Sequence, residues 1–259
     1  DYVVFNDDFR GAFNDSEEYT FFLSTESDAI ASALSLQAGG NSSSTIQQVS
    51  TSHWVVAEGM TIGEALTDAS AEEVIEVRAG TYDENVVVDK AIDLRGPNKD
   101  VACGARSAEA AIAPASGLPI SVVADGVSIN GFEITAPSYQ NAVVCGNTSD
   151  LTLAFNHIHD INSSASPASA NTHAIQYTVG NSPAATSNGT IVDNCFTDIA
   201  SANLTGKSAS AISFLQSTTT GTLTGLSIER NAISNVVVND GAWPTGKIAY
   251  GILLNAGGG

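Results

Sequence analysis

The chain has 259 residues, of which 43% are hydrophobic and 7% aromatic, and its 28 Asp and Glu against 9 Lys and Arg give a formal net charge of −19 at pH 7. This charge excludes nucleic acid as a partner, because binding to phosphates needs a basic surface. The negative charge instead favours cations or neutral glycans as partners, or saline surroundings. The hydrophobic share predicts a core of small aliphatic side chains, and no apolar run is long enough to span a membrane.

The first 60 residues do not follow the repeat that dominates the rest of the chain. Residues 1–5 predict a short strand, and Ser27–Gln37 predicts a helix that ends at Gly39 and Gly40. We therefore expect residues 1–60 to form an N-terminal extension or cap region with short helices, and residues 61–259 to form the main domain.

A capping signal opens the second region. Thr61 is followed three residues later by Glu64, the spacing of a capping box, which predicts a helix near residues 62–70. Short β-branched runs come next and predict strands rather than helices. We expect these strands near Val74–Val77, Val86–Val88 and Ile92–Leu94, with Ala79–Tyr82 as a turn.

An internal repeat fills the later part of the chain. Its three copies are Leu151–Ile161, Thr190–Ile199 and Leu226–Val236, each anchored on one asparagine, with apolar residues three before it and two and five after it. A degenerate earlier copy has Phe132 in the place of the asparagine. The anchors are Asn156, Asn194 and Asn231, spaced 194 − 156 = 38 and 231 − 194 = 37 residues apart.

A second strand recurs between these copies. Its apolar centres are spaced by 32, 37 and 40 residues, and they are Val143, Ile175, Ile212 and Ile252. A period of this length indicates a solenoid, a propeller or an array. The runs alternate with period two and lack helical spacing, so the pattern predicts the coils of a parallel β-helix.

The recurring asparagines have a physical explanation in this fold. Equivalent residues of successive coils lie about 4.8 Å apart, so that identical amides can hydrogen-bond along a ladder. Asparagine also tolerates the left-handed backbone of tight bends. The chain therefore predicts a stacked ladder of Asn156, Asn194 and Asn231; the alternative is that they are only turn residues.

The stretch from Thr61 to Asn98, followed by Val127–Ile134, resembles the opening of pectate-lyase-like right-handed parallel β-helix proteins. The resemblance lies in the helix from Ile62, the run Ala79–Tyr82, Glu84, Val86–Val88, and Leu94 with Gly96 and Pro97. It implies an all-β, right-handed, single-stranded parallel β-helix whose N-terminal helix plugs the solenoid. Such scaffolds carry lyases, hydrolases, binding modules and inert stalks, so the resemblance specifies fold rather than activity.

The last predicted coil, Tyr250–Leu254, has no plug after it. Because terminal repeats normally cap themselves, we expect either flanking domains of a longer surface protein or another copy of the chain on this coil. Head-to-tail stacking of copies is heterologous and can propagate into a filament.

Three cysteines, Cys103, Cys145 and Cys195, cannot all pair within one chain. Cys145 falls in the column of Tyr177 and Phe214, which predicts a buried free thiol, and the redox state of Cys103 stays open. Asn-x-Ser/Thr sequences also arise by chance in chains rich in Ser and Thr. They occur at Asn14, Asn41, Asn147, Asn162, Asn188 and Asn203.

Candidate binding residues gather around the first repeat. His157, His159 and His173 lie close in sequence, and His157 and His159 are expected to point outward together because alternate strand residues share a face. Asp160 is expected to stack with Asp198. Two carboxylates with a loop carbonyl would suit calcium, whereas hydrogen-bonded surface side chains are the simpler interpretation.

Candidate catalytic residues are few. A polysaccharide lyase needs carboxylates and a nearby Lys or Arg, and a hydrolase needs paired carboxylates. The repeat supplies Asp193, Asp198, Glu229 and Arg230, with Arg230 expected in the column of Asp193. This set is small for binding an anionic chain against a charge of −19.

The sequence therefore predicts a non-catalytic structural or adhesive module that is extracellular or at the cell surface. We expect it to be surface-attached or to self-assemble end to end into a filament. No cofactor is required, and calcium is the one candidate ligand ion. The alternative is a carbohydrate-active enzyme, a polysaccharide lyase or glycoside hydrolase, or a glycan-binding module that uses the loop-bearing face.

Overall fold

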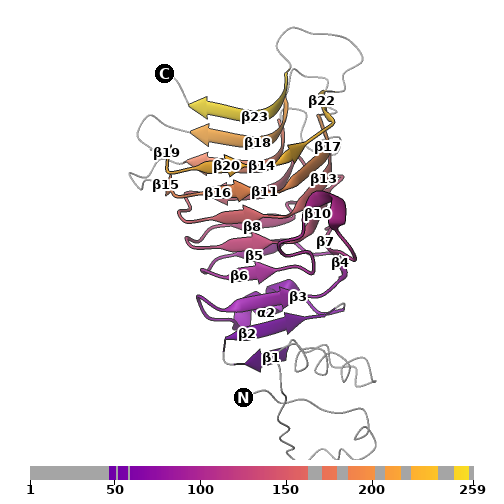
Figure 1. The fold of residues 1–259 in the computed structure, drawn as a ribbon, viewed down its shortest axis with the longest axis vertical. Coiled ribbons are helices and arrows are strands. Elements are labelled where there is room, and N and C mark those ends of the chain that lie inside the picture. Colours follow the sequence, from indigo (N-terminus) through magenta and orange to yellow (C-terminus); the bar gives the residue numbers. More distant parts are fainter. Residues whose placement is uncertain are drawn as a thin grey trace, which may run out of the picture.

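The computed structural model describes residues 47–50, 52–57, 59–162, 171–179, 186–201, 208–216, 223–238 and 248–256. Within them the chain forms a stack of short strands, from β1 (Gln47–Ser50) at one end to β23 (Ala249–Ala256) at the other (Figure 1). The strand expected at residues 1–5 and the helix expected at Ser27–Gln37 lie outside the described residues. Among the described residues, no helix has the length and apolarity to cross a membrane.

The strands form three main sheets, which we call A, B and C. Sheet A contains β1, β2 (His53–Val56), β3 (Val74–Val77), β6 (Asp93–Arg95), β9 (Ser128–Asn130), β12 (Thr152–Ala154), β16 (Thr190–Val192) and β20 (Ser227–Glu229). Sheet B contains β4 (Gly80–Tyr82), β7 (Ala110–Ile112), β10 (Glu133–Ala136), β13 (His157–Asn162), β17 (Cys195–Ser201), β21 (Ala232–Ile233) and β22 (Val236–Val238). Sheet C contains β5 (Val86–Val88), β8 (Ile120–Val122), β11 (Asn141–Gly146), β14 (Thr172–Val179), β18 (Ala209–Gln216) and β23.

The chain visits the sheets in the order A, B, C and then returns to A, so each circuit is one coil of a solenoid. Coil 1 is β3, β4 and β5; coil 2 is β6, β7 and β8; coil 3 is β9, β10 and β11; coil 4 is β12, β13 and β14; coil 5 is β16, β17 and β18; coil 6 is β20, β21, β22 and β23. The strands β15 (Thr186–Ser187) and β19 (Leu223–Thr224) pair in parallel beside coils 5 and 6. A parallel β-solenoid, as the repeat predicted, is confirmed for the described residues.

The register follows the spacing of the repeat. Leu153 pairs with Ile191 and Ile191 with Ile228 in sheet A, while Ile175 pairs with Ile212 and Ile212 with Ile252 in sheet C. The run expected as a turn before Glu84 is instead strand β4, which pairs in parallel with β7. Its three residues are too few to show strand periodicity in the sequence, and only the neighbouring coil completes its hydrogen bonds.

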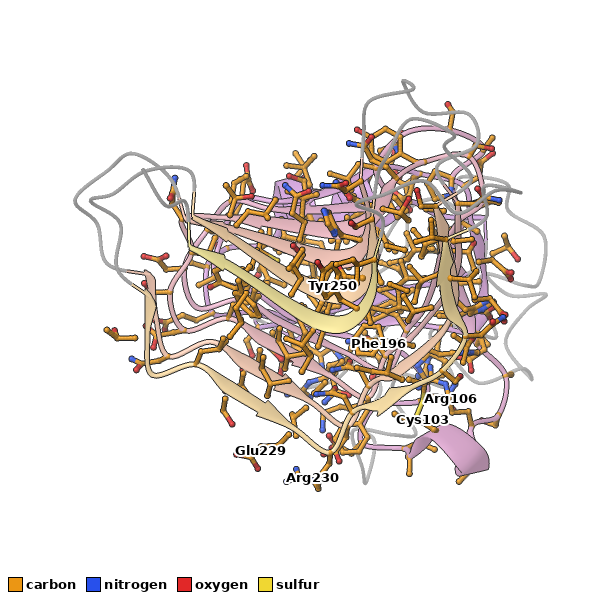
Figure 2. The ribbon with its side chains drawn as sticks, turned by 90° about the horizontal axis from the view of Figure 1, so that it is seen from above. Cys103, Arg106, Phe196, Glu229, Arg230 and Tyr250 are labelled. Atoms are coloured by element: carbon orange, nitrogen blue, oxygen red, sulfur yellow. A yellow bond between two sulfur atoms is a disulfide. The ribbon has the colours of Figure 1, made fainter. Side chains whose placement is uncertain are left out.

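Alternate residues of each strand point into a continuous apolar core between the sheets. Figure 2, seen from above, shows Phe196 between the sheets, and this side chain is fully buried. Along one column of sheet C, Val143, Ile175 and Ile212 are each 0% exposed, but Ile252 of coil 6 is 44% exposed. The described part of coil 6 therefore leaves apolar surface uncovered.

The helix α2 (Ile62–Asp68) packs against β2, β3 and β5 near the N-terminal end of the core. Thr61 Oγ1 accepts a hydrogen bond from Glu64 N at 3.2 Å, so the expected cap forms. Glu84 accepts from the first two helical N–H groups, Ile62 N at 2.7 Å and Gly63 N at 3.0 Å, which have no partner within a helix. Because β2 pairs in parallel with β3, sheet A begins before residue 61, inside the stretch expected as the extension.

Candidate functional site

The outer face of sheet B carries a cluster of histidines and carboxylates from neighbouring coils. The rings of His157 and His159 stack with centroids 4.2 Å apart, so both point the same way from β13. His159 contacts Glu133 Oε1 of coil 3 and Asp160 Oδ2, each at 2.8 Å. Burial lowers the pKa of His157, and His159 and Arg106 nearby add to the effect.

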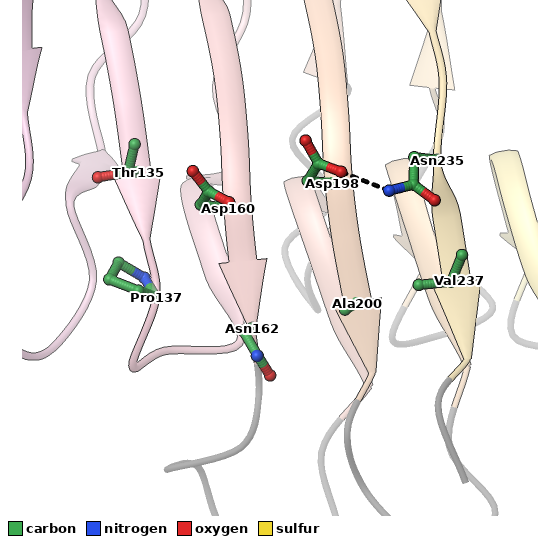
Figure 3. Close-up of a pocket in the computed structure, with 8 residues that line it drawn as sticks. All are labelled: Thr135, Pro137, Asp160, Asn162, Asp198, Ala200, Asn235 and Val237. Carbon is green, nitrogen blue, oxygen red and sulfur yellow. Dashed lines mark hydrogen bonds between the residues drawn. The ribbon is translucent and has the colours of Figure 1, made fainter. Parts of the chain in front are cut away.

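A shallow cleft of about 380 Å³ opens beside this cluster on the same sheet (Figure 3). Asp160 is the extra residue of a bulge, because the register with β10 shifts between Thr135 and Ala136, and Asp198 takes the equivalent place in β17. Both adopt a left-handed backbone, with φ of 52° and 54°. The cleft is lined by Thr135, Pro137, Asp160, Asn162, Asp198, Ala200, Asn235 and Val237.

The structure brings the two residues of the expected calcium site, Asp160 and Asp198, to this one cleft. Asp160 is engaged by His159, and Asp198 accepts a hydrogen bond from Asn235 Nδ2. Calcium takes six to eight oxygen ligands. The described residues contain no group of three or more His, Cys, Asp or Glu side chains arranged to hold a metal ion.

Three of the four candidate catalytic residues, Asp193, Glu229 and Arg230, bind one another. Arg230 Nε and Nη2 donate to Asp193 at 2.8 Å each, and Nη1 donates to Glu229 Oε2 at 3.1 Å. This pairing holds the pKa of the Asp193 carboxyl below its usual range. Figure 2 places Glu229 and Arg230 on the outside of the stack.

Asp198 binds a different partner from Asp193. It lies in the bulge of β17 and binds Asn235, whereas Asp193 lies before β17 and is held by Arg230. Arg230, held by two carboxylates, is likewise occupied rather than available to an anionic substrate.

The third candidate histidine lies apart from the other two. His173 belongs to β14 of sheet C, is 2% exposed, and its Nδ1 lies 2.7 Å from Ser210 Oγ of the next coil. Burial lowers the pKa of His173 to about 4. It is therefore neutral at pH 7 and serves as a buried hydrogen-bonding group between two coils.

This histidine makes stability depend on pH. Its folded pKa of about 4 lies below the unfolded value of 6.5, so the unfolded chain binds the proton first as pH falls. The free energy of unfolding is expected to decrease from about pH 6.5 to about pH 4, by on the order of 3 kcal/mol from this group. Urea unfolding across that range should show the slope in the wild type and a smaller one in His173→Gln; equal slopes would contradict it.

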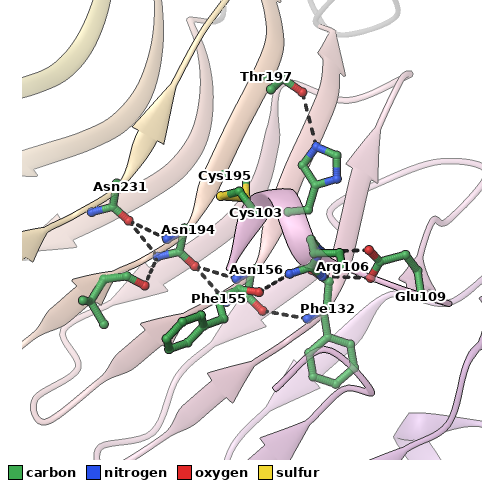
Figure 4. The surroundings of a disulfide bond; sticks show 12 residues. Cys103, Arg106, Glu109, Phe132, Phe155, Asn156, Asn194, Cys195, Thr197 and Asn231 are labelled. Carbon is green, nitrogen blue, oxygen red and sulfur yellow. Dashed lines mark hydrogen bonds and ion pairs between the residues drawn. A yellow bond between two sulfur atoms is a disulfide. The ribbon is translucent and has the colours of Figure 1, made fainter. Parts of the chain in front are cut away.

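The bend between sheets A and B, which we call the A/B corner, carries the asparagine ladder (Figure 4). Asn156 Nδ2 and backbone N both donate to Asn194 Oδ1, at 3.1 and 3.0 Å. Asn194 repeats both contacts to Asn231 Oδ1, at 3.0 and 2.9 Å. Asn156 and Asn194 are 0% exposed and Asn231 is partly buried, so the three amides form one ladder across coils 4 to 6 that is buried in coils 4 and 5.

The residue before each asparagine explains why the corner bends there. Phe155, Asp193 and Arg230 all have a left-handed backbone, with φ of 51°, 56° and 51°. A sharp turn leaves backbone groups that cannot join the strand ladders, and the asparagine side chains bind them. In the degenerate copy the backbone N of Phe132 donates to Asn156 Oδ1 at 3.0 Å and ends the ladder in coil 3.

A disulfide joins Cys103 to Cys195 over the same corner (Figure 4). Cys103 follows β6 of coil 2, whereas Cys195 opens β17 of coil 5, 92 residues later. Cys145 is buried and free, as its column predicted, and burial raises the pKa of its thiol. With Cys145 free, elimination among the three cysteines could have suggested the Cys103–Cys195 pair, but the repeat did not place Cys103, because the loop that carries it lies outside the repeat.

Arg106 lies on the loop that carries Cys103, and sequence reasoning missed it. Its Nη2 donates to Phe132 O at 3.0 Å and to Glu109 Oε2 at 2.8 Å, and its Nη1 donates to Phe155 O. The Arg106 side chain is only 7% exposed. A charged side chain is buried in this way only when it is paired, so the loop is fitted closely to the corner.

No protein-family model, no curated protein and no solved structure matches this chain. The geometry of the corner and of the sheet B face therefore carries the functional argument.

Proposed function

We propose that the chain is a structural module of an extracellular or cell-surface protein, built as a right-handed, single-stranded β-helix of the pectate-lyase-like kind and without a catalytic role. The observation that carries the proposal is that the polar side chains along the coils bind one another. Arg230 is held by Asp193 and Glu229, Asp198 by Asn235, and the corner asparagines by each other. Such pairing stabilises a stack and leaves little for catalysis.

The disulfide supports an oxidising location. Disulfides persist in secreted and surface proteins and are rare where thiol systems keep cysteines reduced. Cys103–Cys195 joins two segments 92 residues apart, a structural rather than a local link. In the sequence Asn188-Gly189-Thr190 the asparagine is exposed and donates to Asp150 Oδ1 at 3.0 Å, and surface glycosylation at such a residue would fit the same setting.

Coil 6 supports assembly at its end. Leu254 is 68% exposed, whereas Phe214, its partner in coil 5, is 3% exposed. An unpaired strand edge with exposed apolar side chains is a template for another strand. We propose that this end stacks on another copy head to tail, or on a flanking domain of a longer surface protein.

The cleft on sheet B favours a second role, glycan binding, because carboxylates, amides and a hydroxyl line it together with the apolar side chains of Pro137, Ala200 and Val237. Sugars present both hydroxyls and apolar ring faces to such a surface. In this role Asp160 and Asp198 would contact ligand hydroxyls or calcium, and the module would act as an adhesin. A carbohydrate-active enzyme remains the competing hypothesis.

Negative-stain imaging of the full chain, with and without the substitution Leu254→Lys, tests the structural role. We expect elongated end-to-end particles whose length grows with concentration, and single short rods for Leu254→Lys, because a charged edge side chain opposes strand addition. Compact single particles at every concentration would contradict assembly. Release of new reducing ends from a polysaccharide panel, lost in Asp198→Ala but kept in Asp193→Ala, would contradict the non-catalytic role.

A further inference from the structure

The loop between β6 and β7 crosses several coils on the outside of the solenoid. We call its tip, residues 101–106, the latch. From coil 2 the latch reaches Phe132 O of coil 3 and Phe155 O of coil 4 through Arg106, and Cys195 of coil 5 through Cys103. It therefore runs along the axis of the stack and spans coils 2 to 5, while the strands it crosses run around that axis.

The base of this loop is closed by bonds that do not involve the disulfide. Asn98 is 0% exposed; its Oδ1 accepts from Ser107 N at 2.9 Å, and its Nδ2 donates to Glu109 Oε2 at 2.7 Å. Asn130 of coil 3 and Asp100 bind each other through Asn130 Nδ2 at 2.9 Å. These contacts hold residues 98–100 to residues 107–109 and to coil 3. Glu109 also accepts from Arg106, but none of the contacts involves Cys103 or Cys195.

The corner beneath the latch is also held by its own bonds. Asn156, Asn194 and Asn231 bind each other and the carbonyls of Ile129, Leu153 and Ile191, and none of these hydrogen bonds involves residues 101–106. Losing the latch would therefore leave the coils in register. Reduction would remove the covalent link between the latch and coil 5. The hydrogen bonds of Arg106 would then be the ones that hold the tip to coils 3 and 4.

We propose that the latch is released by reduction: cleavage of Cys103–Cys195 frees residues 101–106 from the A/B corner while the coils stay folded. Release withdraws the Arg106 guanidinium from the Phe132 and Phe155 carbonyls and uncovers Cys195, a residue that is 6% exposed while the disulfide is intact.

The chemistry is thiol–disulfide exchange with an external dithiol. One thiolate of the dithiol attacks Cys103 Sγ, which lies on an exposed residue, and the S–S bond breaks to leave Cys195 as a thiolate that takes a proton from water. The second thiol of the reductant then displaces Cys103 from the mixed disulfide. The dithiol is oxidised to its disulfide by two electrons, and the protein gains two thiols.

Pulsed alkylation of the full chain with iodoacetamide, read by mass spectrometry for each cysteine, tests release. After reduction with dithiothreitol we expect Cys195 to react within about threefold of the rate of Cys103, since both thiols would face solvent. Cys145, buried and free, reports on the coils and is expected to react at least about tenfold more slowly.

The variant Cys103→Ser removes the link without any reductant and serves as the matched control. In it Cys195 should react as fast as in the reduced wild type, with Cys145 still protected. Slow reaction of Cys195 in both samples would mean that Arg106 keeps the latch closed and would overturn the proposal. Rapid reaction of Cys145 would overturn it too, because the coils would have opened with the latch.

Discussion

Replacing Cys103 and Cys195 together by serine is expected to lower the free energy of unfolding by about 4 to 5 kcal/mol. The disulfide closes a loop with a sequence separation of 92 residues, and cross-linking a loop of that length removes about this much chain entropy from the unfolded state. Equilibrium unfolding in urea under oxidising conditions, with matched wild type, measures the difference.

A reductant separates the disulfide from the effect of serine itself. Wild type in reductant should fall to the stability of the double variant, and the double variant should not respond. Cys145→Ala, which leaves the disulfide intact, should keep the full response to reductant. If reduced and oxidised wild type unfold at the same urea concentration, the disulfide does not stabilise this fold.

Asn194→Leu is expected to cost about 3 to 5 kcal/mol of stability. Leucine fills a similar volume but makes no hydrogen bonds. Asn156 N, which now donates to the Asn194 side chain at 3.0 Å, and Leu153 O, which now accepts from it at 2.8 Å, would both lose their partner in buried surroundings. Each buried group left unpaired costs about 1 to 3 kcal/mol. Thermal or urea unfolding of the purified variant measures the loss.

Asn235→Gly is the control for this prediction. Asn235 also belongs to a column of polar residues, but its side chain is exposed and binds only Asp198 among the described residues. Its backbone is left-handed, with φ of 49°, a conformation that glycine adopts without the strain that alanine would add. We expect a loss below about 1 kcal/mol, because exposed hydrogen bonds exchange readily with water. Equal losses at Asn194 and Asn235 would show that the ladder contributes no more than a surface contact.

Much of this geometry was accessible from spacing alone. Three asparagines 38 and 37 residues apart predicted the coil length, and parallel pairing of equivalent residues requires that length. Thr61 with Glu64 predicted the helix start for a reason that involves only local hydrogen bonds. Local bonding and repeated spacing are properties of the linear chain, so reasoning from the sequence reaches them.

Other features depend on which surfaces meet. His173 was grouped with His157 and His159 by proximity in sequence, yet it belongs to sheet C and pairs with Ser210. Arg106 gave no signal, because its partners are the carbonyls of Phe132 and Phe155 on two later coils. The cleft arises where Asp160 and Asp198 bulge from adjacent strands, and a single strand does not reveal that neighbourhood.

The sequence by itself determined that this chain is built of stacked parallel coils with an asparagine at one bend, because a repeat of constant length makes each coil pair with its own copy. Only the tertiary structure decided that Cys103 reaches Cys195 and that a loop from coil 2 lies across coils 3 to 5. That loop is outside the repeat, so its place depends on the shape of the assembled corner and on the bonds that only the folded stack presents to it.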